Sequence, residues 1–422
     1  MRGRDAMRVY QAAARVWLTA AALSLLLPRS VRMQWWVPLH LFLVGGVSVA
    51  ISGAMQTFVA ALTAAGPTPP VLLWGQFGLT NLGAALLIAG RASTTDSLVA
   101  VGGSAFLLGI ALLGLIVLRA RRRALHLRHR LPVGMYEAAI LCVLAGAGIG
   151  IALGTGAAPG RSYVDLRSAH LVLNVLGWVS LTIAGTLITL LPTVLRVRMP
   201  VWSGRATRVL FVAGVAATAA GLAIGWSPLA VAGALAFAGG VAGLLAMVGR
   251  AAATPRNWPV PLSARHLLLA LAWFTAGSLW LVVALARGVD WFAGAVDVFV
   301  LIFGGGWILQ TLLGAWLYLL PMNRPGHPDR RRAELAAIEW GGTVELVSLN
   351  LGVAMLAVAA GIGGASALAA VGAALALAGA GMALAKAWTF PLLGRSDALT
   401  RRGRPVWDPA ARPRGPGTPS GS

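Results

Sequence analysis

Long apolar runs dominate this sequence and leave a lipid bilayer as the solvent in which it can fold. Hydrophobic residues make up 58% of the 422 residues and charged residues 11%, too little polar surface to cover a water-soluble protein of this size. A helix spans the hydrocarbon with about twenty apolar residues. Runs of this kind lie near 9–27, 34–63, 71–90, 97–118, 133–153, 168–192, 207–226, 228–249, 265–286, 292–322, 336–361 and 365–387. The sequence therefore predicts an all-α membrane protein with about twelve transmembrane helices within residues 1–395.

The arginines predict how these helices are oriented. When twelve helices are threaded, four arginine-rich loops fall on one side of the membrane: Arg119–Arg130, Arg196–Arg208, Arg250–Arg265 and Arg324–Arg332. Cytoplasmic loops retain basic residues, so we expect this side and both termini to face the cytoplasm, and the membrane to be the cell's inner (plasma) membrane. Residues 396–422, rich in Pro, Gly and Arg, are predicted to form a disordered basic tail.

The basic residues also bear on the partners of the chain. They are scattered in short clusters and do not form the contiguous basic face that is typical of nucleic-acid binding. Membrane lipid is the expected partner. The single cysteine, Cys142, has no second cysteine with which to form a disulfide within the chain.

Two of the apolar runs share a motif. Identical spacings of eight and seven residues separate Gly177, Gly185 and Pro192 in one run, and Gly306, Gly314 and Pro321 in the other. The run 34–63 repeats the eight-residue spacing at Gly45 and Gly53, without the proline. Close approach of membrane helices at small residues is the alternative explanation. The shared Gly-Trp pair and Leu-Leu-Pro ending favour an internal repeat of four helices, and hence a bundle of three four-helix arcs.

Histidine is the residue type that points to chemistry. His40 and His170 lie in the first turns of two repeat-related helices, at the predicted outer face. Ionisable groups within the membrane are costly and mark functional sites, and imidazole binds haem iron and copper. An interfacial histidine that bonds water or a carbonyl is the alternative for both. His266, beside Arg265, is predicted to be an interfacial anchor, and surface positions are predicted for His126, His129 and His327.

Other polar residues within the predicted spans are candidates to support such a site. Asp297 lies at a depth comparable with the two histidines, and Gln56 and Asn174 lie in the same helices as they do. Each could hold a liganding imidazole in place, and Asp297 could instead be a carboxylate that handles protons. A simple hydrogen bond between helices is the alternative for each of them. Glu345 lies near the cytoplasmic side, where an arginine could pair with it.

The helices that carry His40 and His170 resemble the histidine-bearing helices of haem-copper oxidase subunit I. The likeness rests on His40-Leu-Phe-Leu-Val-Gly with Gly53-Ala-Met-Gln56, and on His170-Leu-Val-Leu-Asn-Val-Leu-Gly-Trp with Leu191-Pro192. It is strongest to the divergent NnrS-like branch and to membrane domains attached to copper-containing oxidases. The resemblance implies twelve helices in three arcs, a haem b or copper site that uses His40 and His170, and a role in redox, nitric-oxide or metal homeostasis.

Departures from that family limit what the resemblance implies. The oxidases carry further histidines on their seventh and tenth helices, whereas the runs 207–226 and 292–322 contain none. A competent oxygen-reducing centre is therefore not expected, and an electron partner would be a separate protein. A membrane transporter or a cofactor-free scaffold with the same fold is the alternative function.

Overall fold

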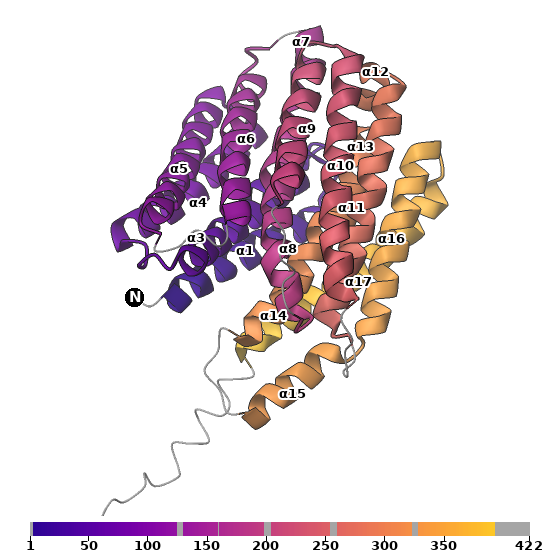
Figure 1. Ribbon diagram of the computed structural model, residues 1–422. Coiled ribbons are helices and arrows are strands. Elements are labelled where there is room, and N and C mark those ends of the chain that lie inside the picture. Colours follow the sequence, from indigo (N-terminus) through magenta and orange to yellow (C-terminus); the bar gives the residue numbers. More distant parts are fainter. Residues whose placement is uncertain are drawn as a thin grey trace, which may run out of the picture.

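The computed structural model describes residues 3–124, 130–158, 160–197, 204–253, 260–322 and 328–392, which fold into helices without a strand among them (Figure 1). Eleven helices of this part of the chain are long and apolar enough to cross a membrane. The remaining long helix, α1 (Gly3–Ser24), packs in the same bundle but carries Arg8 and Arg15. The predicted tail 396–422, the loop histidines His126, His129 and His327, and most of the arginine-rich loops lie outside the described residues.

Three units follow one another along the chain. The first contains α1, α2 (Trp36–His40), η1 (Leu41–Val47), α3 (Ser48–Thr63), α4 (Pro70–Ala92) and α5 (Asp96–Arg122). The second contains α6 (Arg130–Gly154), α7 (Arg161–Val172), η2 (Leu173–Ser180), α8 (Leu181–Val194), α9 (Arg205–Ala223) and α10 (Ser227–Ala252). The third contains α11 (Leu262–Ala286), α12 (Val289–Gly294), α13 (Val296–Val300), η3 (Leu301–Leu309), α14 (Gln310–Met322), α15 (Pro328–Glu339), α16 (Gly342–Ile362) and α17 (Ser366–Leu392).

One continuous helix of each unit lies at the centre of the bundle. These three central helices, α2–η1–α3, α7–η2–α8 and α13–η3–α14, have 56%, 72% and 61% of their apolar window buried, against 17–44% for the other eight spanning helices. They are the helices that share the glycine motif, so the predicted repeat exists in three dimensions. We call the end at which α2 and α7 begin the histidine end; α7 marks it at the top of Figure 1.

Each central helix widens into a π-helix at the same point, over seven, eight and nine residues for η1, η2 and η3. A glycine in each π-helix lets a side chain of the preceding helix approach. A Cβ on Gly45 would lie 2.5 Å from Trp17, one on Gly177 2.5 Å from Cys142, and one on Gly306 2.4 Å from Trp273. π-helices are rare and are concentrated at functional sites, and here all three occur at repeat-related positions.

Each unit ends in a tightly packed helical hairpin: α4 with α5, α9 with α10, and α16 with α17. In each hairpin the backbones of the two helices are in direct contact at a glycine: Gly83, Gly214 and Gly352. A Cβ at these positions would lie 2.4, 2.5 and 2.3 Å from a main-chain nitrogen of the partner helix. The partner helices each supply two glycines seven residues apart: Gly102 and Gly109, Gly233 and Gly240, and Gly372 and Gly379. This second repeated motif extends the internal repeat beyond the central helices.

Two boundaries differ from the sequence prediction. The predicted run 292–322 is interrupted after α12, and the spanning helix begins at Val296. The run 336–361 is divided by a turn at Gly341, whose φ of 66° suits a residue without a side chain. Hydrophobicity continues across both turns, which is why the sequence pattern did not reveal them.

Candidate functional site

His170 is held against a glycine face of α6. Its Nδ1 lies 2.7 Å from the carbonyl oxygen of Gly146. Because a carbonyl only accepts hydrogen bonds, Nδ1 carries the proton of the neutral imidazole and donates it. Gly150, one turn further along α6, makes room for the ring, since a Cβ there would lie 2.7 Å from Cε1 of His170. The Nε2 atom is left with its lone pair.

His40 has the same tautomer for a different reason. Its Nδ1 lies 2.8 Å from the carbonyl oxygen of Trp36, one turn earlier in the same helix. The imidazole also stacks on the Trp36 indole, with ring centroids 3.8 Å apart and an interplanar angle of 17°. Within the described part of the chain, Nε2 of His40 and Nε2 of His170 have no hydrogen-bond partner, and both side chains are half-buried.

The two histidines lie at the same end of two central helices, His40 directly before η1 and His170 three residues before η2. An imidazole that donates through Nδ1 to a carbonyl and leaves Nε2 bare is the usual arrangement of a metal-liganding histidine. Each of the two imidazoles, taken separately, therefore has the arrangement of a metal ligand. The described residues contain no group of three or more His, Cys, Asp or Glu side chains that could hold a metal ion.

The three supporting residues predicted from the sequence differ in where the structure places them. Asn174 contacts His170: its Nδ2 donates to the His170 carbonyl at 2.7 Å and lies 3.2 Å from Nδ1. Gln56 lies far from the histidine end, where its amide donates to Tyr10 at 3.0 Å and to Gln76 at 3.2 Å. Asp297 is exposed in the first turn of α13. The structure thus brings only Asn174 to a candidate ligand.

A buried ionic cluster at the opposite end corrects two predictions. His266 and Glu345 are both 0% exposed. Nε2 of His266 donates to Glu345 Oε1 at 2.9 Å, and Lys386, the chain's only lysine, donates to Oε2 at 2.6 Å. His266 is therefore not an interfacial anchor, and the partner of Glu345 is a lysine and a histidine instead of an arginine. The sequence does contain a signal for this cluster: Lys386 is a single lysine in an apolar helix, and such a residue calls for a buried carboxylate partner.

The repeat explains where this cluster lies. Tyr10 and Trp17 of α1 are seven residues apart, as are His266 and Trp273 of α11. Trp17 donates to Asn81 at 2.8 Å and Trp273 to Asn350 at 2.7 Å, while Tyr10 donates to Gln76 at 2.6 Å. His266 with Glu345 is thus the charged counterpart of Tyr10 with Gln76.

A central cavity was not predicted from the sequence. Its volume is about 90 Å³, and its walls come from α1, α3, α8 and α14 and from the adjoining ends of η1 and η3. Neither His40 nor His170 lines it, because both lie nearer the histidine end than any of its lining residues in their own helices. No sequence pattern marked this cavity, since its walls are ordinary apolar faces of four helices.

The helical bundle is similar to that of a solved membrane oxidase. A haem-copper terminal oxidase dimer, determined by cryo-electron microscopy, contains a chain that superposes with a TM-score of 0.69, covering 97% of this chain and 85% of that one at 12% sequence identity. This chain has the fold of haem-copper oxidase subunit I. No protein-family model and no curated protein matches the sequence. In this subunit I-like fold, α9 and the helix α13–η3–α14 contain no histidine.

Proposed function

We propose that this subunit I-like membrane protein is NnrS-like and binds one haem b or copper centre at its histidine end, in redox, nitric-oxide or metal homeostasis. The observation that carries the proposal is the shared tautomer of His40 and His170. In both, Nδ1 donates to a backbone carbonyl and Nε2 keeps its lone pair. Neutral imidazole nitrogen suits both iron and copper.

The protein residues have separate roles in this proposal. Gly146 fixes the His170 tautomer, Trp36 fixes that of His40 and stacks on its ring, and Asn174 restrains the backbone of His170. The bound centre would supply one-electron chemistry or a site for a small diatomic ligand. With two histidine ligands and none on the helices that follow, oxygen reduction is not the proposed activity, and the electron partner is a separate protein.

The proposed orientation places the histidine end at the outer face of the plasma membrane and both termini in the cytoplasm. It rests on the arginine-rich loops, all of which join helices at the other end of the bundle. A ligand or electron partner would then reach the metal centre from outside the cytoplasm.

Optical spectra and metal analysis of gently extracted protein test the proposed function. We expect a Soret band or about one copper per chain, and its loss in His40→Ala and in His170→Ala. Cys142→Ala is the control, because Cys142 packs on Gly177 in the same region and is not a proposed ligand; it should retain the metal centre. A colourless and metal-free wild type would overturn the proposal and favour a transporter or scaffold.

A further inference from the structure

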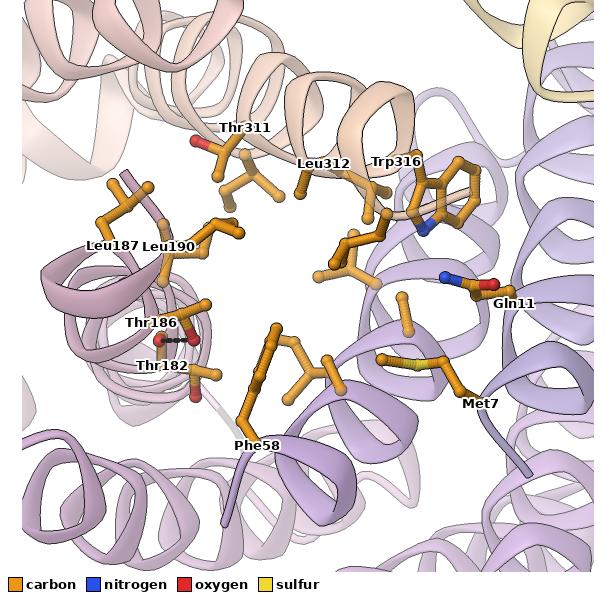
Figure 2. Close-up of a pocket in the computed structure, with 18 residues that line it drawn as sticks. Met7, Gln11, Phe58, Thr182, Thr186, Leu187, Leu190, Thr311, Leu312 and Trp316 are labelled. Carbon is orange, nitrogen blue, oxygen red and sulfur yellow. Dashed lines mark hydrogen bonds between the residues drawn. The ribbon is translucent and has the colours of Figure 1, made fainter. Parts of the chain in front are cut away.

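The largely apolar wall of the central cavity carries two neighbouring nitrogen donors, from Gln11 and Trp316. Figure 2 looks nearly along the helices and shows the Gln11 amide and the Trp316 indole nitrogen next to each other on one side of the cavity. Gln11 is 4% and Trp316 3% exposed. Neither side chain has a hydrogen-bond partner in the described part of the chain, yet the polar atoms of both are open to the cavity. Both donors are therefore available to a molecule that occupies the cavity.

The other polar groups of the wall do not supply an acceptor for these donors. Thr182 donates to the Trp178 carbonyl at 2.7 Å, and Thr186 to the Thr182 carbonyl at 2.8 Å. In Figure 2 these threonines line the side opposite Gln11, and the Thr311 hydroxyl points away from the centre. None of the 18 lining residues is charged. An ionic ligand would therefore be buried without a counter-charge, which is prohibitively costly.

We infer that this cavity binds a neutral, lipid-soluble molecule that carries a carbonyl oxygen. The oxygen would accept from Gln11 Nε2 and Trp316 Nε1, while the rest of the molecule lies along the apolar faces of α3, α8 and α14. A few well-placed polar groups in an apolar pocket are typical of small-molecule sites. The half-buried Phe58 and Leu319 line the same cavity, which is partly open, so such a molecule can enter from within the membrane.

The cavity also departs from the internal repeat. All three central helices line it, but of the three helices α1, α6 and α11 that precede them in their units, only α1 does. The residues that correspond to Trp316 by the repeated glycine motif are Leu187 and Met55, which carry no donor. The donor pair is thus unique to one of three related positions.

Fluorine NMR of the full-length protein labelled with 5-fluorotryptophan tests this inference. The Trp316 resonance is assigned by its loss in Trp316→Phe. The probes are 2-heptanone, which has a carbonyl and an alkyl chain, and heptane, which has the chain alone. We expect a saturable shift of the Trp316 resonance with 2-heptanone and binding weaker by about tenfold in Gln11→Leu, since one hydrogen bond is lost. Gln11→Asn, which shortens the side chain but keeps an amide, should also weaken binding.

Two controls separate this site from a simple void and from the histidine end. Met7→Leu changes a lining residue without altering volume or donors and should bind 2-heptanone as the wild type does. The double variant His40→Ala, His170→Ala should also bind 2-heptanone normally. The cavity inference therefore does not depend on whether the histidines bind a metal. Equal affinity for heptane, a shift that never saturates, no shift at all, or unchanged affinity in both Gln11 variants would each overturn the inference.

Discussion

Trp178 donates its indole N–H to the hydroxyl of Ser48 at 3.0 Å and so joins two central helices across 130 residues of sequence. Trp307 makes the repeat-related bond to Ser180, also at 3.0 Å. Each serine in turn donates to the carbonyl five residues earlier, Leu43 or Val175, at 2.8 Å. The serines therefore connect the contact between helices to the π-helical segments.

Removing one of these hydroxyls should loosen the centre of the bundle. Ser180→Ala removes the only acceptor that the structure shows, among the described residues, for the buried Trp307 N–H, together with the side-chain bond to the Val175 carbonyl, and we expect a loss of about 1–3 kcal/mol of stability. Thermal unfolding of purified protein in detergent measures it. Ser104→Ala, at an exposed position on α5, should unfold like the wild type. Equal melting temperatures for Ser180→Ala and the wild type would contradict a structural role for the bond.

The buried pair of Glu345 and Lys386 should tolerate loss of both charges better than loss of one. Lys386→Met leaves the Glu345 carboxylate buried without its cation, and breaking a buried pair costs about 3–5 kcal/mol. The double variant Glu345→Gln, Lys386→Met removes both charges and should recover much of that stability. Size-exclusion profiles and melting temperatures report the result.

A matched control for this experiment is the exposed pair of Arg161 and Asp290, whose nitrogen and oxygen lie 2.9 Å apart. Asp290→Asn should cost less than about 1 kcal/mol, because exposed ion pairs contribute little. A double variant no more stable than Lys386→Met would show that Glu345 is not destabilising once its lysine is removed.

The hairpin glycines should be intolerant of even one added carbon. A Cβ on Gly83 would lie 2.4 Å from the backbone nitrogen of Phe106, so α4 and α5 must separate in Gly83→Ala. We expect a loss of about 1–3 kcal/mol, as for other overpacked sites, measured as a lower melting temperature. Gly78, in the same helix, has no atom within 4 Å of such a Cβ, and Gly78→Ala should be neutral or stabilising. The reverse order would contradict the packing described.

A subtler change than removing a ligand should disturb the histidine end. Gly150→Ala places a methyl group 2.7 Å from Cε1 of His170 and should displace the imidazole from its bond to Gly146. We expect at least tenfold weaker binding of the metal centre, as for loss of groups that orient a ligand. Gly148→Ala, where nothing lies within 4 Å, is the control on the same helix. Metal retention after dialysis against a chelator, or the Soret absorbance, separates the two variants.

The proposed topology can be tested by labelling. In a Cys142→Ala background, Ser93→Cys lies between α4 and α5 and should react with a membrane-impermeant maleimide in intact cells. Ala253→Cys, after α10, should react only once the cells are permeabilised. Both positions are exposed, so access and not burial decides the outcome. The opposite pattern would place the histidine end in the cytoplasm.

The sequence by itself determined the helical membrane architecture and the repeat, because both depend on local patterns. Spans follow from the length of apolar runs, and Gly45, Gly177 and Gly306 follow from a fixed spacing that close helix packing requires. It also pointed to His170 and Asn174, which lie one turn apart on one helix. These features do not depend on how the helices are arranged in space.

Only the tertiary structure decided which distant groups meet. The sequence places Gln56 in the same helix as His40, but the fold turns it toward Tyr10 and Gln76. His266 and Glu345 looked like separate boundary residues, and the packing of α11, α16 and α17 buries them together with Lys386. The central cavity arises where four helices fail to fill the space between them. Such contacts depend on how helices pack side by side, which no single helical pattern encodes.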